Sequence, residues 1–104
     1  MSLAAGNAKN MGIDAVLEEM RSNARSAKLQ EKWCTELANL AWRNAENQGK
    51  IGAQGGIELV LEAMRRHAGS ADVQESCGKA LANFADGNAE NQGKIGAQGG
   101  IELV

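Results

Sequence analysis

The sequence predicts an all-α fold assembled from repeated groups of helices. A 17-residue segment, NAENQGKIGAQGGIELV, occurs at 44–60 and again, letter for letter, at 88–104, which sets a period of 44 residues. The chain has no Pro, no Tyr and a single Phe, whereas sheet proteins usually place Pro in turns and aromatic residues in strands. Apolar residues recur at helical spacing in each period. Helices are therefore expected throughout.

A stripe of four apolar residues predicts the second helix of each repeat. In both copies the positions i, i+3, i+4 and i+7 are apolar, as on the buried face of an amphipathic helix. The stripe consists of Ile13, Val16, Leu17 and Met20 in one copy, and of Ile57, Val60, Leu61 and Met64 in the next. We therefore expect one helix over 13–20 and another over 57–64.

A longer stripe predicts the third helix of each repeat. Its members are Leu29, Trp33, Leu37, Leu40 and Ala41 in one copy, and Val73, Cys77, Leu81, Phe84 and Ala85 in the next. Ser26 and Ser70 precede these stripes, and a Ser side chain there can accept a hydrogen bond from the first turn. Both serines are predicted N-caps. Trp33, inside the stripe, is expected to pack in the core.

Each unit is predicted to begin with a short first helix, from Glu46 to Gln54 in the complete repeat, with Asn44 as its N-cap. The pair Gly55–Gly56 then ends it, because residues without a Cβ permit a sharp turn. Each unit thus contains three helices. A single domain over 1–104 would comprise a partial repeat (1–43), a complete repeat (44–87) and a truncated repeat (88–104).

Several short motifs resemble the armadillo repeat family. LANLA at 37–41 and LANFA at 81–85 end the long stripes, GKIGAQGGIELV follows the N-cap Asn44 closely, and Val73-Gln74-Glu75 opens the second long stripe. These motifs occur together, in order, and over nearly the whole chain. The resemblance implies an all-α, armadillo-type right-handed α-solenoid with three helices per repeat.

The same resemblance implies a non-catalytic scaffold that binds a protein or peptide segment. In that family, Asn side chains on the third helices clasp the backbone of an extended peptide, and Asn39 and Asn83 match them. An amide side chain suits this role because it both donates and accepts hydrogen bonds. We take Asn39, Asn83, Trp42 and Glu36 as candidate peptide-binding residues. An Asn in a helix can instead face water or bond to an adjacent turn, and this alternative stays open.

Composition and charge bear on partners and location. The net charge of −2 is spread over 11 basic and 13 acidic residues without a block of one sign, so neither nucleic acid nor a membrane is an expected partner. No signal-peptide pattern opens the chain. Cys34 and Cys77 are interpreted as reduced core thiols. A cytoplasmic or nuclear location is expected if the chain is natural, and none can be assigned if it is engineered.

No catalytic or metal-binding pattern is found. His67 is the only histidine and ends a predicted helix beside Arg65 and Arg66, so a solvated helix end is expected there rather than a ligand or base. The run QGKIGAQGG fits neither of the phosphate-binding glycine motifs and follows no predicted strand. We therefore expect no enzyme activity, no cofactor and no metal.

The chain ends suggest a second function, self-assembly. A solenoid normally needs terminal repeats with polar outer faces, whereas the last residues include Ile95, Ile101, Leu103 and Val104. These four are candidate self-association residues of a homo-oligomer, either a closed dimer or an open filament. Seventeen identical consecutive residues also indicate recent duplication or deliberate design. The alternative function is therefore an engineered or excised armadillo fragment that self-assembles and has no native ligand.

Overall fold

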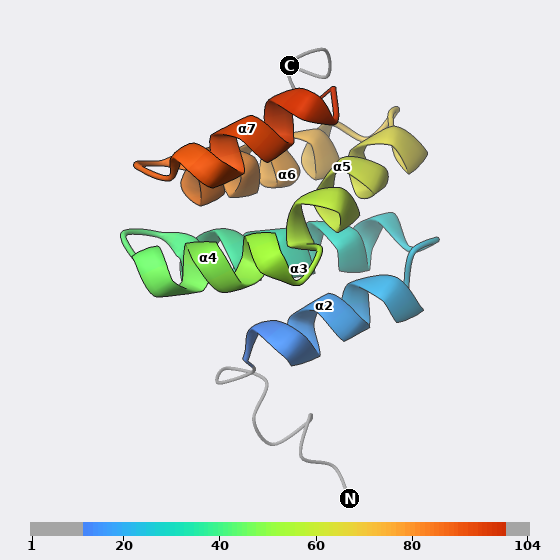
Figure 1. The fold of residues 1–104 in the computed structure, drawn as a ribbon. Helices are drawn as coiled ribbons and strands as arrows, with labels where there is room; N and C mark the ends of the chain where they lie inside the picture. The colour runs from blue at the N-terminus through green and yellow to red at the C-terminus, as the bar shows by residue number, and fades with distance from the viewer. Residues whose placement is uncertain (1–11, 100–104) are drawn as a thin grey trace, which may run out of the picture.

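A computed structural model of the chain describes residues 12–99, and these residues are all-helical (Figure 1). The described helices are α2 (Ile13–Ser22), α3 (Ala27–Ala41), α4 (Ala45–Ala53), α5 (Gly56–Arg66), α6 (Ala71–Ala85) and α7 (Ala89–Ala97). Helix α6 begins 44 residues after α3, and α7 begins 44 residues after α4, as the sequence period requires. The predicted all-α class is confirmed.

The predicted N-caps are confirmed, because each accepts a hydrogen bond from the first turn of its helix. The Ser26 hydroxyl accepts from the backbone N–H of Leu29 at 3.1 Å, and Asn44 Oδ1 accepts from that of Asn47 at 2.9 Å. Ser70 and Asn88 make the same bonds at the starts of α6 and α7. The short helix α4 begins and ends one residue earlier than predicted.

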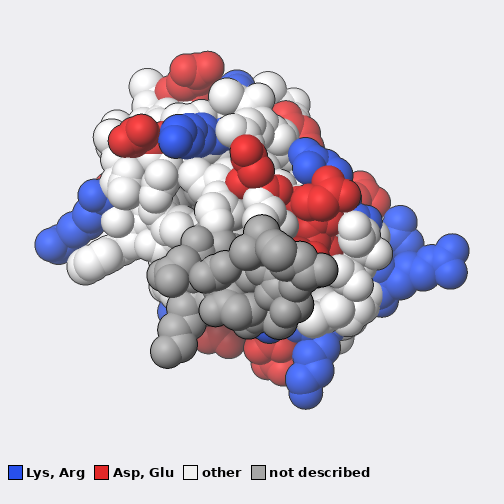
Figure 2. Space-filling model, turned by 90° about the horizontal axis from the view of Figure 1, so that it is seen from below, with Lys and Arg blue, Asp and Glu red and all other residues white. Residues whose placement is uncertain are grey.

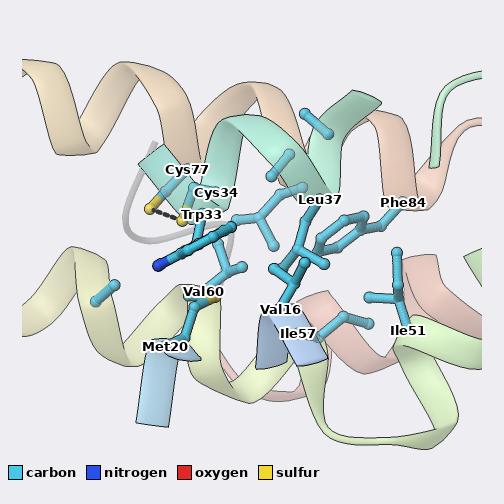
Figure 3. Close-up of a cluster of buried hydrophobic side chains, with 14 of the residues drawn as sticks. Val16, Met20, Trp33, Cys34, Leu37, Ile51, Ile57, Val60, Cys77 and Phe84 are labelled. Carbon is cyan, nitrogen blue, oxygen red and sulfur yellow. Dashed lines mark hydrogen bonds between the residues drawn. The ribbon is translucent and has the colours of Figure 1, made fainter. Parts of the chain in front are cut away.

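The two apolar stripes form one core. All eight residues of the shorter stripes are buried, and the longer stripes contribute Trp33, Leu37, Ala41, Val73, Cys77, Leu81 and Phe84. Leu29, Leu40 and Ala85 are half-buried. Figure 3 shows members of this cluster from α3 and α6 pointing toward those of α2, α4 and α5. The predicted place of Trp33 in the core is confirmed at 6% exposure.

Side-chain amides hydrogen-bond to the carbonyls that helix ends leave unpaired. The last carbonyls of a helix have no partner within the helix. Gln30 Nε2 donates to the carbonyl oxygen of Met20 at 3.1 Å, in the last turn of α2, and to that of the C-cap residue Asn23 at 2.9 Å. Gln74 does the same for α5, and Asn47 Nδ2 donates to the carbonyl oxygen of Leu40 at the end of α3. These bonds fix where each helix meets the next.

The second group of helices packs on the first. Helix α3 packs on α6, α2 on α5 and α4 on α7, and the later group lies above the earlier one in Figure 1. His67 joins the two groups, since it is half-buried and its Nε2 donates to the carbonyl oxygen of Ala24 at 2.8 Å. His67 lies at the end of α5, as predicted, but it is only partly solvated there because it is half-buried beside Ala24.

The surface carries charges of both signs. Figure 2 shows Lys and Arg side chains among Asp and Glu side chains on the face viewed from below. Within the described range, none of the helices is long and apolar enough to span a bilayer.

The two glycines between α4 and α5 serve different purposes. Gly55 has φ +87°, in the left-handed region that other residues enter only at a cost. Gly56 is buried, and a Cβ there would lie 2.9 Å from the carbonyl oxygen of Ile51. The predicted turn at this pair is confirmed.

We expect Gly55→Ala to lower the free energy of unfolding by about 1 kcal/mol, because the new side chain must hold a left-handed conformation. Urea unfolding followed by circular dichroism measures this. Gly49→Ala is the matched control, since Gly49 lies inside α4 and a Cβ there meets nothing within 4 Å. The control should be neutral or stabilising by up to about 1 kcal/mol. Equal losses in the two variants would contradict a requirement for glycine at 55.

Candidate functional site

Three of the four predicted peptide-binding residues lie around one surface hollow. Asn39, Trp42, Lys79 and Asn83 line this hollow, whose volume is about 450 Å³. Asn39 lies near the end of α3 and Asn83 lies 44 residues later, near the end of α6. Lys79 precedes Asn83 by one turn of α6. The packing of α3 on α6 thus brings together residues that are far apart in the sequence.

Trp42 is the one large apolar side chain that the described residues expose, at 59%. It is the C-cap residue of α3, where the chain leaves the helix with an extended backbone. The guanidinium carbon of Arg43 lies 4.7 Å from the centroid of the Trp42 ring, a cation–π distance. Packing against Arg43 leaves most of the indole open to solvent.

Arg43 adopts a backbone conformation that is unusual for a side-chain-bearing residue. Its φ is +50°, and it is the only non-glycine with positive φ in the described range. The equivalent position in the next repeat is Gly87, with φ +68°. The turn after the long helix therefore requires the left-handed region in both copies, and Arg43 occupies it at an energetic cost.

The two amides differ in how much of their hydrogen-bonding capacity remains. Asn83 Nδ2 donates to the carbonyl oxygen of Ala38 at 2.8 Å, which ties α6 to the end of α3. Its second N–H and its Oδ1 form no further hydrogen bond with the described part of the chain. Asn39 is exposed, and its side chain has no hydrogen bond to residues 12–99. One donor of Asn83 is thus structural, while Asn39 faces solvent.

Glu36 does not lie with the other predicted binding residues. It is half-buried and lines a different hollow of about 550 Å³, together with Lys28, Leu29, Glu31, Lys32 and Thr35. Of the self-association residues, Ile95 is half-buried and packs against the core. Ile101, Leu103 and Val104 lie outside the described residues, so their role stays a prediction.

The sequence interpretation missed a contact between the two cysteines. Cys34 on α3 and Cys77 on α6 are both fully buried, and their Sγ atoms lie 2.7 Å apart (Figure 3). Both are free thiols, as predicted. The hydrogen bond to Cys77, followed by burial, raises the pKa of the Cys34 thiol. Their separation of 43 residues, one less than the period, was the signal that could have revealed the contact.

The hollow of Asn39, Trp42, Lys79 and Asn83 is lined by groups that can make noncovalent contacts with a ligand. Amide donors and acceptors, an ammonium group and an indole surround the hollow of Asn39, Trp42, Lys79 and Asn83. Such groups can hold a peptide backbone and an apolar or cationic side chain. In residues 12–99, no group of three or more His, Cys, Asp or Glu side chains could hold a metal ion.

Over residues 12–99 the fold is all-helical, with a solvent-facing hollow at the ends of two packed helices. The family model described as the spinocerebellar ataxia type 10 protein domain matches residues 29–101, which is more than half of the chain. The chain therefore belongs to the spinocerebellar ataxia type 10 protein domain family. The comparisons with curated proteins and with solved structures found no match.

The predicted membership of the armadillo repeat family is wrong, because the matching family is a different one. The structure gives the physical reason. The LANLA motif supplies Leu37, Ala38 and Ala41 to the core, Gly55 makes a left-handed turn, and Gln74 hydrogen-bonds to helix-end carbonyls. Any closely packed helical repeat needs such residues. The motifs therefore reflect the general requirements of helix packing and capping, and they do not identify one family.

Proposed function

We propose that this chain is a non-catalytic scaffold that binds an extended peptide or protein segment across the ends of α3 and α6. The observation that carries the proposal is the grouping of Asn39, Trp42, Lys79 and Asn83 around one hollow. Asn39 would pair with a peptide backbone, and the exposed indole of Trp42 would contact a side chain of the ligand. Lys79 would favour an acidic group nearby.

The local backbone supports this proposal. Arg43, whose φ of +50° belongs to the turn after α3, adjoins Trp42. Its guanidinium carbon lies 4.7 Å from the centroid of the indole ring, which stays mostly exposed. We further propose that the helices form a right-handed α-solenoid with three helices per 44-residue repeat. The packing of α3 on α6, α2 on α5 and α4 on α7 supports this arrangement.

The test is selection of binders from a displayed library of random linear peptides, followed by fluorescence titration of the best peptide. We expect weak binding, because only two amide positions face the ligand, and we expect Trp42→Ala to raise Kd by about tenfold or more. Thermal stability should change little, because Trp42 is 59% exposed. Asn39→Ala should also raise Kd.

Glu62→Ala is the matched control for these variants. Glu62 is exposed on α5 and lines another hollow, with Met20, Arg21, Ala24, Gln30, Leu59, Ala63 and Arg66. Its substitution should leave Kd unchanged. The proposal fails if the library yields no binder, or if the selected peptides bind Trp42→Ala and Asn39→Ala as tightly as the unsubstituted chain.

A further inference from the structure

We infer that Cys34 and Cys77 form an oxidisable dithiol site whose disulfide would link α3 to α6. Each cysteine lies inside a 15-residue helix, and both side chains belong to the same buried cluster. Their Sγ atoms lie 2.7 Å apart, so a bond of about 2.05 Å needs a closer approach of less than about 1 Å. This inference does not depend on peptide binding.

The pairing arises from the way the two long helices pack. The contacts between α3 and α6 advance in the same direction along both helices, from Cys34 beside Cys77 to Ala38 beside Asn83. The helices are therefore parallel, and residues about one period apart face each other. Cys34 corresponds to Gly78 in the next repeat, and Cys77 corresponds to Trp33. The two cysteines thus occupy non-equivalent positions that meet at this interface.

The reaction needs a two-electron oxidant, and a small disulfide such as glutathione disulfide is the class that we propose. The thiolate of one cysteine attacks a sulfur of glutathione disulfide, which releases one glutathione and leaves a mixed disulfide. The second cysteine then attacks the protein sulfur of that mixed disulfide and releases the second glutathione. Two protein S–H groups become one S–S bond, and the two protons and two electrons end on two glutathione thiols.

Burial controls the rate of this reaction. Both sulfurs are shielded from solvent, and little of a buried thiol with a raised pKa is present as the reactive thiolate. Oxidation therefore waits for local opening of the helices. Once one cysteine has reacted, closing of the helices brings the other cysteine back beside it, so the mixed disulfide should be short-lived. We expect slow oxidation that sub-denaturing urea accelerates.

The test incubates the chain in glutathione buffers of increasing oxidising ratio, with and without sub-denaturing urea, and then alkylates the remaining thiols. We expect a monomer about 2 Da lighter than the reduced chain and without alkyl groups. Because the sequence has two cysteines, this mass identifies their pairing. The disulfide closes a long loop, so Tm should rise by roughly 10 °C or more and fall back on reduction.

Cys34→Ala and Cys77→Ala are the matched controls, since each keeps one thiol and should neither lose this mass nor gain in Tm. If a variant does not fold, non-reducing peptide mapping of the oxidised unsubstituted chain still reports whether the Cys34 and Cys77 peptides are linked. Two alkylated thiols under the most oxidising buffer with urea would overturn the inference. Glutathione adducts, covalent dimers or a lowered Tm after oxidation would overturn it as well.

Discussion

Phe84→Ala is expected to lower the free energy of unfolding by about 3–5 kcal/mol, a large part of the stability of a small domain. Phe84 is the largest of the fully buried side chains. It comes from α6, and its ring points toward Leu37 of α3 (Figure 3). Truncation removes the ring from the buried core cluster and leaves a cavity in its place.

Urea unfolding followed by far-ultraviolet circular dichroism measures this loss as a lower midpoint with an unchanged slope. The repeat offers a matched control in Leu40, which is equivalent to Phe84 but only half-buried. Leu40→Ala should cost clearly less, and Phe84→Leu less than about 1.5 kcal/mol. If Phe84→Ala lowers the free energy of unfolding no more than Leu40→Ala does, then the burial of Phe84 does not contribute the stability that we expect.

Sequence alone predicts the helices well, because their signals are local. The apolar spacing from Ile57 to Met64 requires a single helical face, and that face is buried. Ser26 and Asn44 cap the helices that follow them through bonds within three residues. Gly55 makes its turn from its own backbone preference. None of these features depends on the path of the rest of the chain.

The candidate site is predicted only in part, because its parts come from different repeats. Asn39 and Trp42 are near in sequence, but their approach to Asn83 depends on how α3 packs on α6. The spacing placed Glu36 one turn from Asn39, yet Glu36 faces another hollow. The predicted family was wrong for a related reason. Residues that any packed helical repeat requires do not distinguish one family from another.

Buried amides are the part of the fold that the sequence conceals most completely. Three polar residues are buried, with at most 4% of each exposed: Gln30, Gln48 and Asn91. Asn and Gln usually face solvent. Gln48 Nε2 donates to the carbonyl oxygens of Asn83 at 2.9 Å and Asp86 at 3.1 Å, around the end of α6. The position of a polar residue along a helix does not reveal that carbonyl oxygens at the end of another helix need a hydrogen-bond donor. These bonds hold one group of helices to the next.

We expect Asn91→Ala to lower the free energy of unfolding by about 2–3 kcal/mol. Asn91 Nδ2 donates to the carbonyl oxygens of Gln48 at 3.0 Å and Phe84 at 2.9 Å, so one side chain joins α7 to both α4 and α6. The Phe84 carbonyl lies in the last turn of α6, where the helix supplies no partner. Removing the amide leaves this oxygen without its donor in a site that water does not reach.

Asn47→Ala is the matched control, because Asn47 is the repeat equivalent of Asn91. Asn47 Nδ2 donates to the carbonyl oxygen of Leu40 at 2.8 Å and is half-buried. Nearby water can replace that bond, so the control should cost about 1 kcal/mol. Urea unfolding of the two variants and of the double variant gives the comparison. If the two single variants lose equal stability, then burial of the Asn91 amide adds nothing to the stability of the fold.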